Sequence, residues 1–533
     1  MTATPAAAAP RRGRQPPLLL ATLAAIVVGA AMLPLAYLLV RAVGADEEAR
    51  DAVRLEPTLR LVLDTVLLVV GVVAVALVLG TALAWLVVRT DLPGRRAWGV
   101  ALTLPLVIPS YVAALVLLGA LGPKGLLQQA LEPLGVERLP DLYGYDGALI
   151  ALTLSTYPYV FLIAAAALRS VDISLEEAAR SLGRTPLRVF LTVTLPALRP
   201  ALGAAALLVA LYVLADFGAV SLMQYPTLTR AVYLQYESLL DRNAAAILAL
   251  VLVALAGVVV ALEGRMGRRG ATYRSSPGAG RRARTVQLGR KRWGASAFCA
   301  TCVALFLALP LGVLAWWAIE GGSFRLAWSA AFDSAAASGS AAACAAVAAI
   351  PVALLAWRHP SRPSRFLERL AYIPNAVPGI AIALGLVYFG ARYGGVLYQS
   401  LALLIFAYVV RFLPQALATT RSALDLVDPR VEEASRSLGR GSARTLVSVV
   451  LPLARPGVLA GSALVFLSAM KELPATLLLR PIGFDTLATE IWTDTSVGAY
   501  SEAAPSALLL IAVSAPLVYA LSARRAWELG APG

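Results

Sequence analysis

The chain has very little of what soluble enzymes use for their chemistry. Its 533 residues include three cysteines, one histidine and only 14% charged residues, against 59% hydrophobic ones. Soluble domains carry about 25% charged residues, so a soluble enzyme, a disordered chain and a fibrous chain are excluded. The cysteines lie within apolar runs and His359 stands alone, so we expect no disulfide framework, metal site or other cofactor.

Long uncharged runs take the place of the missing charge. A run of about 18 or more apolar residues is typical of a helix that spans a membrane. Twelve such runs lie at about 18–40, 61–88, 99–119, 148–168, 201–221, 244–262, 294–318, 335–357, 370–390, 397–417, 458–475 and 504–522. We therefore predict an all-α integral membrane protein with about 12 transmembrane helices.

Basic and acidic loops alternate along the chain. Arg89, Arg95 and Arg96 follow the second run, whereas Asp46 and Glu47 follow the first. Under the positive-inside rule this pattern predicts that the protein lies in a bacterial inner membrane with both termini on the cytoplasmic side. The net charge of +15 is thus explained by short cytoplasmic loops beside membrane lipid, and no nucleic-acid partner is indicated.

Nucleotide chemistry is also excluded. A phosphate-binding P-loop needs Gly-Lys before Ser or Thr. The three lysines, Lys124, Lys291 and Lys471, do not follow a glycine. We expect no catalytic residue in this chain.

The two halves of the chain repeat each other. Residues 172–200 align with 428–456 at a constant offset of 256, through Glu-Glu-Ala, Ser-Leu-Gly-Arg, Leu-Pro and Arg-Pro. A second block pairs Arg89 with Arg358 at an offset of 269. Both copies enter the membrane from the same side, so they are parallel repeats.

Each copy of the repeated loop predicts a helix of about nine residues. Ser174 with Glu177 has the pattern of a capping box, Gly183 suits the end of the helix, and Asp428 before Pro429 is the cap of the second copy. The apolar stripes are Leu175, Ala178, Ala179 and Leu182, and Val431, Ala434, Ser435 and Leu438; Glu176 faces Arg180 and Glu432 faces Arg436 at i, i+4. Because so short a helix is marginal alone, the stripe either packs on the protein's own surface or docks into a groove on a separate soluble subunit.

The pattern Glu-Glu-Ala-x-x-x-Leu-Gly, followed by Leu-Pro-x-x-x-Pro, resembles the "EAA" loop of the permeases of binding-protein-dependent ABC importers. Its two copies resemble the fused, double-domain branch with two type-1 permease halves. The resemblance implies coupling helices for two copies of a cytoplasmic ABC ATPase, and a periplasmic or extracytoplasmic substrate-binding protein. The residues that match the coupling pattern are Glu176, Glu177, Ala178, Gly183, Glu432, Glu433, Ala434 and Gly439. Ser435 departs from it, because alanine is usual there.

This resemblance implies a division of the chain into six parts. They are a cytoplasmic tail with the first transmembrane helix (1–56), a first permease domain (57–262), a basic cytoplasmic linker (263–293), a leading helix (294–334), a second permease domain (335–523) and a cytoplasmic tail (524–533). The linker is either a solvated tether or a patch for anionic lipid headgroups.

Charged residues within apolar runs are costly and indicate function by default. Such residues are Asp64, Asp216, Arg411, Lys471 and Glu472. Asp216 and Glu472 occupy equivalent positions in the two copies, at the offset of 256, and we call such residues mates. The pair either lines the transport path or its gate, or serves locally, with Asp216 capping a broken helix and Lys471 neutralising Glu472. We expect structural roles for Asp64 and Arg411, which have no mates.

The substrate is indicated by one run of residues. Residues 471–481, followed by 484–488, resemble the ferric-iron permease subfamily, although permeases for sulfate, molybdate and thiamine have related helices. A rival from another class is a proton-coupled secondary transporter, because residues 91–96 resemble the loop signature of the major facilitator family. The second half lacks that signature, and the facilitator family has no paired Glu-Glu-Ala loops.

Overall fold

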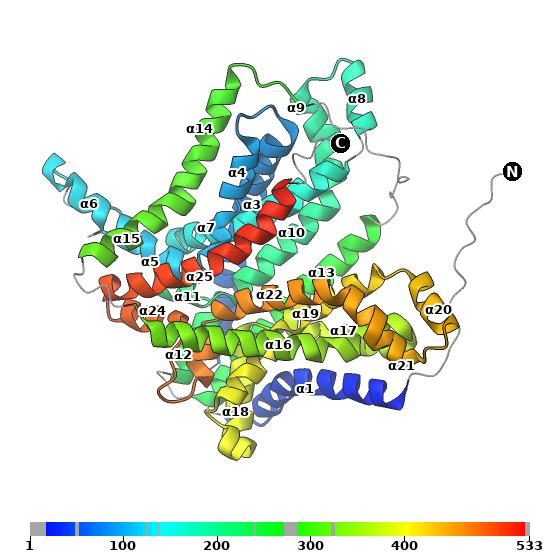
Figure 1. Cartoon of the computed structure of the whole chain (residues 1–533). Coiled ribbons are helices and arrows are strands. Elements are labelled where there is room, and N and C mark those ends of the chain that lie inside the picture. The colour runs from blue at the N-terminus through cyan, green and yellow to red at the C-terminus, as the bar shows by residue number, and fades with distance from the viewer. Residues whose placement is uncertain are drawn as a thin grey trace. The chain divides into compact units, whose positions relative to one another are not determined.

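The computed structural model describes residues 17–47, 53–123, 125–136, 138–171, 173–237, 241–270, 285–320 and 326–527. Within these ranges the chain is built of helices, and the only extended pairing is an isolated bridge between Thr90 and Val286 (Figure 1). The all-α class predicted from the sequence is confirmed.

Twelve helical segments of the described chain are long and apolar enough to cross a membrane, as the sequence predicts. They are Leu18–Val43, Leu55–Arg89, Ser110–Leu134, Tyr145–Ser170, Phe190–Ala215, Arg242–Leu262, Lys291–Glu320, Trp328–Arg358, Gly379–Leu397, Leu401–Asp425, Ser442–Met470 and Tyr500–Ala520.

The third and ninth segments begin about ten residues later than predicted. The helix α5 (Ser110–Leu121) starts directly after Pro109, and α18 (Gly379–Phe389) starts directly after Pro378. Both prolines have extended backbone angles, with ψ of 153° and 145°. A proline has no N–H group to donate within a helix and fixes its own φ, so each span restarts after its proline.

Contacts divide the chain into two compact units. One comprises Met1–Leu33, Ser338–Asn375 and Ile405–Ala469, and the other comprises Pro34–Ala337, Ala376–Leu404 and Met470–Gly533. In the first unit α19 (Leu401–Asp425) packs closely on α22 (Leu451–Met470). A Cβ atom at Gly461 would clash with the hydroxyl of Thr419, so the glycine permits this close approach.

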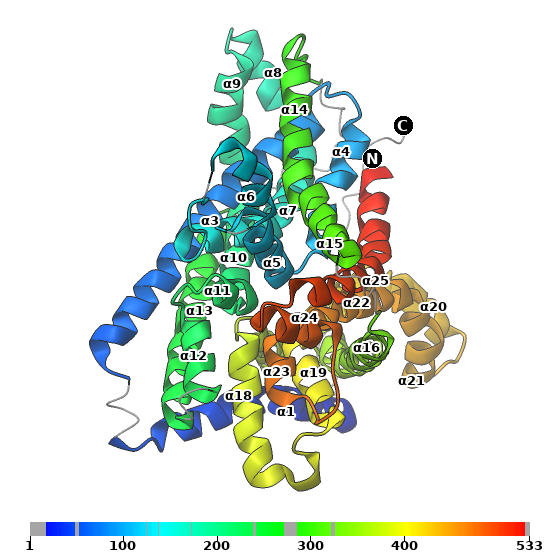
Figure 2. The same ribbon diagram turned by 90° about the vertical axis from the view of Figure 1, so that its left-hand side faces the viewer.

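In the second unit α3 (Leu55–Arg89) packs along α7 (Tyr145–Ser170) and α10 (Leu195–Ala215) (Figure 2). A Cβ atom at Gly80 of α3 would lie 2.9 Å from the carbonyl oxygen of Tyr157, so the glycine permits this close approach. The packing holds the loop that follows α7 beside the end of α3.

The predicted linker is partly helical. The helix α13 (Arg242–Gly270) continues into it and α14 (Lys291–Val303) begins within it, while residues 271–284 lie outside the described part. The described residues before α14 run back to the end of α3, where Val286 forms the bridge to Thr90.

The remaining elements of the described chain comprise two further long helices, α16 and α25, and shorter elements that connect and extend the long helices. They are α4 (Arg95–Ala101), η1 (Leu104–Val107), α6 (Leu126–Leu131), η2 (Glu132–Leu134), α8 (Ile173–Ser181), α9 (Pro186–Val189), η3 (Phe190–Thr194), α11 (Gly218–Leu222), α12 (Leu228–Glu237), η4 (Ala304–Ala308), α15 (Leu309–Glu320), α16 (Trp328–Arg358), α17 (Arg362–Ala371), η5 (Ile373–Asn375), η6 (Gly390–Gly394), η7 (Gly395–Leu397), α20 (Pro429–Ser437), α21 (Ser442–Thr445), η8 (Leu446–Val450), α23 (Pro474–Leu479), α24 (Leu487–Ser496) and α25 (Tyr500–Trp527).

Candidate functional site

The repeated loop forms the helices α8 and α20, each of nine residues as predicted. Gly183 and Gly439 follow them with left-handed φ angles of +79° and +80°. After α8 the N–H of Gly183 donates to the Arg180 carbonyl at 2.9 Å and the next N–H donates back to Ala179 at 3.3 Å, and the second copy repeats both distances. These reverse turns need the left-handed backbone that glycine adopts without strain.

The two helices differ at their starts. Asp428 caps α20, because its carboxylate accepts the N–H of Arg430 at 2.9 Å, and Pro429 is the first helical residue as predicted. The capping box predicted for Ser174 is wrong, since α8 already begins at Ile173 and Ser174 lies inside it. The repeat places Asp172 opposite the cap Asp428, and that residue lies outside the described chain.

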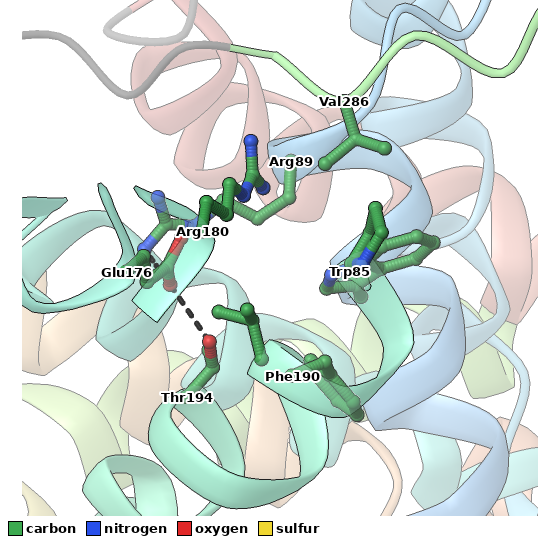
Figure 3. A pocket seen from close by; sticks show the side chains of 9 residues that line it. Trp85, Arg89, Glu176, Arg180, Phe190, Thr194 and Val286 are labelled. Atoms are coloured by element: carbon green, nitrogen blue, oxygen red, sulfur yellow. Dashed lines mark hydrogen bonds and ion pairs between the residues drawn. The ribbon is translucent and has the colours of Figure 1, made fainter. Parts of the chain in front are cut away.

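Glu176 of α8 points into the protein. Its side chain is 10% exposed and its Oε1 lies 3.3 Å from Nη2 of Arg89, which is itself 4% exposed. The same oxygen accepts the Thr194 hydroxyl at 2.7 Å (Figure 3). Arg89 is the last residue of the long helix α3, so the pair fastens the short helix to the end of a membrane span.

The second half repeats this arrangement. Arg358, the last residue of α16, pairs with Glu432 of α20, which is 2% exposed. Arg436 lies 2.5 Å from the same carboxylate, which confirms the predicted i, i+4 pair. Sequence reasoning missed Arg89 and Arg358 as site residues. The signal was available, because they are mates at the offset of 269 and each ends a long apolar run.

The apolar stripe of each helix faces outward. Leu175 of α8 is 58% exposed. Leu182 and Leu438, which directly follow α8 and α20, are 80% and 81% exposed. The other exposed residues on these helices include Glu177, Ala178, Val431, Glu433 and Ala434. Only the third of the four stripe residues is buried in each copy, at Ala179 and Ser435. Each helix therefore presents an uncovered apolar face above a buried ion pair.

Ser435, which departs from the family pattern, has a matched partner. Its hydroxyl lies 3.1 Å from that of Thr445, and both side chains are buried. At the mate positions the first copy has Ala179 and Val189, which are also buried. A polar pair thus replaces an apolar pair, and each of these two buried hydroxyls has the other as its partner.

The carboxylates of Asp216 and Glu472 lie at helix breaks, and the sequence analysis considered a break only at Asp216, as one of two alternatives. Asp216 ends α10, accepts the N–H groups of Ala219 and Val220 at 3.0 and 3.3 Å, and accepts the Ser110 hydroxyl. Glu472 accepts the N–H of Ala475, the mate of Ala219, at 3.4 Å. Both side chains are buried and cap the short helix that follows the break, so the local role considered for Asp216 is present.

The two breaks lie close to each other within one unit. A Cβ atom at Gly218 would lie 3.2 Å from Leu473, and the ring of Phe217 lies 5.0 Å from that of Trp492. Lys471 donates to the carbonyl oxygen of Leu106 at 2.5 Å. The structure thus brings the mate carboxylates into one region, where the first and second halves meet.

The remaining charged candidates have local contacts. The backbone carbonyl of Asp64 accepts the hydroxyl of Tyr225 at 3.1 Å, and the guanidinium of Arg411 lies 5.6 Å from the ring of Phe412. Among the residues that the structure describes, no three His, Cys, Asp or Glu side chains form a group that could hold a metal ion.

Comparisons with known proteins find the same loop-bearing halves. The family described as "Binding-protein-dependent transport system inner membrane component" matches residues 76–266 and 345–528. The Fe(3+)-transport system permease protein FbpB 2 of Haemophilus influenzae is 35% identical over 95% of this chain and 98% of its own length. The ferric transport system permease protein FbpB of Actinobacillus pleuropneumoniae is 26% identical over 78% and 64%. The molybdenum transport system permease protein ModB of Escherichia coli is 36% identical over 26% and 60%.

Proposed function

The chain belongs to the family of binding-protein-dependent transport system inner membrane components, and on that premise we propose that it is the fused permease of an ATP-driven importer for ferric iron. It is a multi-pass membrane protein of two permease halves, each matched by the family. The transport step requires ATP hydrolysis by a separate subunit, because this chain has no phosphate-binding loop.

The observation that carries the proposal is the design of α8 and α20. Each helix holds a glutamate inward on an arginine at the end of a long helix and turns an apolar side chain, Leu175 or Val431, outward. An exposed apolar stripe on a short, anchored helix fits a groove on a soluble partner. We assign the partner to two copies of a cytoplasmic ABC ATPase, with Glu177, Ala178, Glu433 and Ala434 on the contact faces and Gly183 and Gly439 ending the helices.

Orientation and domain limits follow from this assignment. The permease domains are residues 57–262 and 335–523, and the basic linker 263–293 lies on the ATPase side. Both termini are then cytoplasmic, and a substrate-binding protein docks on the opposite face of the inner membrane. Asp216 and Glu472 belong to the path or its gate, and their position at adjoining helix breaks, where the halves meet, supports this role.

Ferric iron is the proposed substrate because a permease named for Fe(3+) transport matches nearly the whole chain. Molybdate is the second candidate, since a molybdenum permease matches 26% of the chain at similar identity. A sulfate permease of Synechococcus elongatus, 33% identical, covers 22% of it. These shorter matches are typical of a shared permease core, whereas the long match includes the linker and both halves.

Uptake by proteoliposomes tests the substrate. The chain is reconstituted with its ATPase and binding protein, and radiolabelled ferric iron, molybdate and sulfate are offered in parallel. ATP-dependent uptake of ferric iron alone is expected. Uptake of molybdate or sulfate, with no iron uptake, would replace the substrate and keep the importer class.

The coupling faces are tested with changes at exposed positions. Leu182→Asp together with Leu438→Asp should abolish ATP-driven uptake without loss of folded protein, because both side chains are about 80% exposed. Leu182→Met with Leu438→Met is the matched control and should transport normally. Normal uptake by the aspartate variant would mean that these faces do not contact the ATPase.

A further inference from the structure

The end of the linker is fastened to the first permease half beside α8. The N–H of Val286 donates to the carbonyl of Arg89 at 2.8 Å, and the N–H of Asp91 donates to the carbonyl of Val286 at 3.2 Å. The N–H of Leu288 donates to the carboxylate of Asp91 at 2.8 Å. Residues 286–288, which we call the strap, are thus held by three hydrogen bonds to the residues that end α3.

The strap lies over the base of the first coupling helix. Val286 lines the same small cavity as Arg89, Glu176 and Arg180, and Figure 3 shows its side chain near that of Arg89. Arg89 is therefore held from two sides, since its side chain pairs with Glu176 and its carbonyl accepts the strap. Movement of the strap would move the residue on which α8 rests.

The second half cannot form the same attachment. At the offset of 269 the mate of Asp91 is Pro360, which has neither an N–H group to donate nor a carboxylate to accept. The neighbouring Ser361 instead caps α17 and forms a capping box with Ser364. Two of the three strap bonds are therefore specific to the first half, although the buried ion pairs beneath α8 and α20 are alike.

We propose that the strap positions the first coupling helix, so that the covalent connection between the halves supports α8 and not α20. Asp91 and Val286 are positioning residues, which act on the ATPase contact through Arg89 and Glu176. This inference rests on the proposed function, because α8 is a coupling helix only in an ATP-driven importer. It replaces both alternatives for the linker's end, a solvated tether and a lipid patch, with a structural contact.

Hydrogen–deuterium exchange of the full chain in lipid nanodiscs tests the proposal without any ATPase or substrate. Asp91→Ala removes the acceptor for Leu288, and exchange of the α8 amides should rise about three- to tenfold, the range for one hydrogen bond. Exchange of the α20 amides should not change. Asp91→Asn keeps an acceptor oxygen and should behave as the unchanged chain.

Two further variants keep the test decisive. Leu288→Pro removes the N–H donor of the same hydrogen bond and replaces Asp91→Ala if that variant fails to fold. Pro360→Ala is the control at the equivalent position of the second half. Unchanged exchange at α8 in Asp91→Ala and Leu288→Pro would overturn the proposal. So would an equal rise at α8 and α20, which would mean a general loss of stability.

A second readout links the strap to coupling. In the assembled importer the loosened variants should lower substrate-stimulated ATP hydrolysis relative to the basal rate, and Pro360→Ala should not. The positioning role would be overturned if exchange at α8 rises while the ratio of substrate-stimulated to basal ATP hydrolysis stays unchanged. The exchange experiment uses no substrate, so its result does not depend on whether iron is the substrate. A failure of the proposed function can therefore be distinguished from a failure of the strap proposal.

Discussion

Arg89 at the end of α3 and Glu176 in the first turn of α8 form an ion pair that is almost closed to solvent, with side chains 4% and 10% exposed. The mate pair, Arg358 with Glu432, closes the same contact in the other half. The two pairs differ in one respect. Glu432 also contacts Arg436 at 2.5 Å, whereas Glu176 accepts the hydroxyl of Thr194.

This difference predicts unequal costs for removing the two arginines. Arg89→Met removes the guanidinium that pairs with the buried Glu176, and it should lower the free energy of unfolding by roughly 3–5 kcal/mol. Arg358→Met should cost at least about 1 kcal/mol less, because Arg436 stays on Glu432. Denaturant unfolding in detergent measures both values. Equal losses would contradict the stated role of Arg436.

The glycines that end α8 and α20 give a prediction with an internal control. Gly183→Ala and Gly439→Ala should each cost about 1 kcal/mol, because φ is near +80° at both sites and alanine resists that conformation. Gly441→Ala is the control, since its φ is −65° and open space surrounds its Cβ position. Gly183→Asn should recover part of the loss. Equal effects at Gly439 and Gly441 would rule out backbone strain as the cause.

The buried hydroxyl pair of the second half predicts a coupled response. Thr445→Val removes the hydroxyl that pairs with Ser435 and should cost about 1–2 kcal/mol. Adding Ser435→Ala recreates the apolar pair that the first half has at Ala179 and Val189, and stability should return to nearly the original value. A double-mutant cycle of unfolding measures the coupling. Additive losses would show that the two hydroxyls act independently.

Substitutions at Asp216 and Glu472 distinguish a role in lining the transport path from a role in capping the short helices. Asp216→Asn and Glu472→Gln keep an oxygen that can accept the N–H groups of Ala219 and Ala475, so both variants should fold. If the carboxylates line the path, uptake should fall severalfold in the double variant while its expression stays normal. Asp216→Ala is the comparison, since loss of the cap costs about 1 kcal/mol. Normal uptake by the Asn/Gln variant would leave capping as the role of the pair.

The sequence predicted features that depend on a few neighbouring residues better than features that depend on distant ones. Local patterns predicted the long apolar helices, the two nine-residue helices, the glycine ends and the cap at Asp428, because each rests on a few neighbouring residues. The break at Asp216 was considered only as an alternative and the break at Glu472 was not predicted, because the apolar runs continue through both and the carboxylates that cap the next helices resemble ordinary buried acids.

Contacts between distant segments could be predicted only where the repeat helps. Arg89 and Glu176 lie 87 positions apart in the sequence, and no local pattern joins them, although both have mates at fixed offsets. The strap could not be found in this way. Its bonds are made by backbone groups of residues 286–288, which carry no motif, and its acceptor Asp91 has no counterpart in the second half.

The most direct test of the account is ATP-driven uptake of ferric iron by the reconstituted chain with Glu176→Ala and Glu432→Ala combined. The unchanged chain, with its ATPase and binding protein, should import iron only when ATP is present, and the chain alone should hydrolyse no ATP. The folded double variant, once reconstituted, should lose uptake, since both coupling helices lose their buried anchor. Uptake by the double variant at the original rate, or proton-driven uptake without any ATPase, would contradict the account.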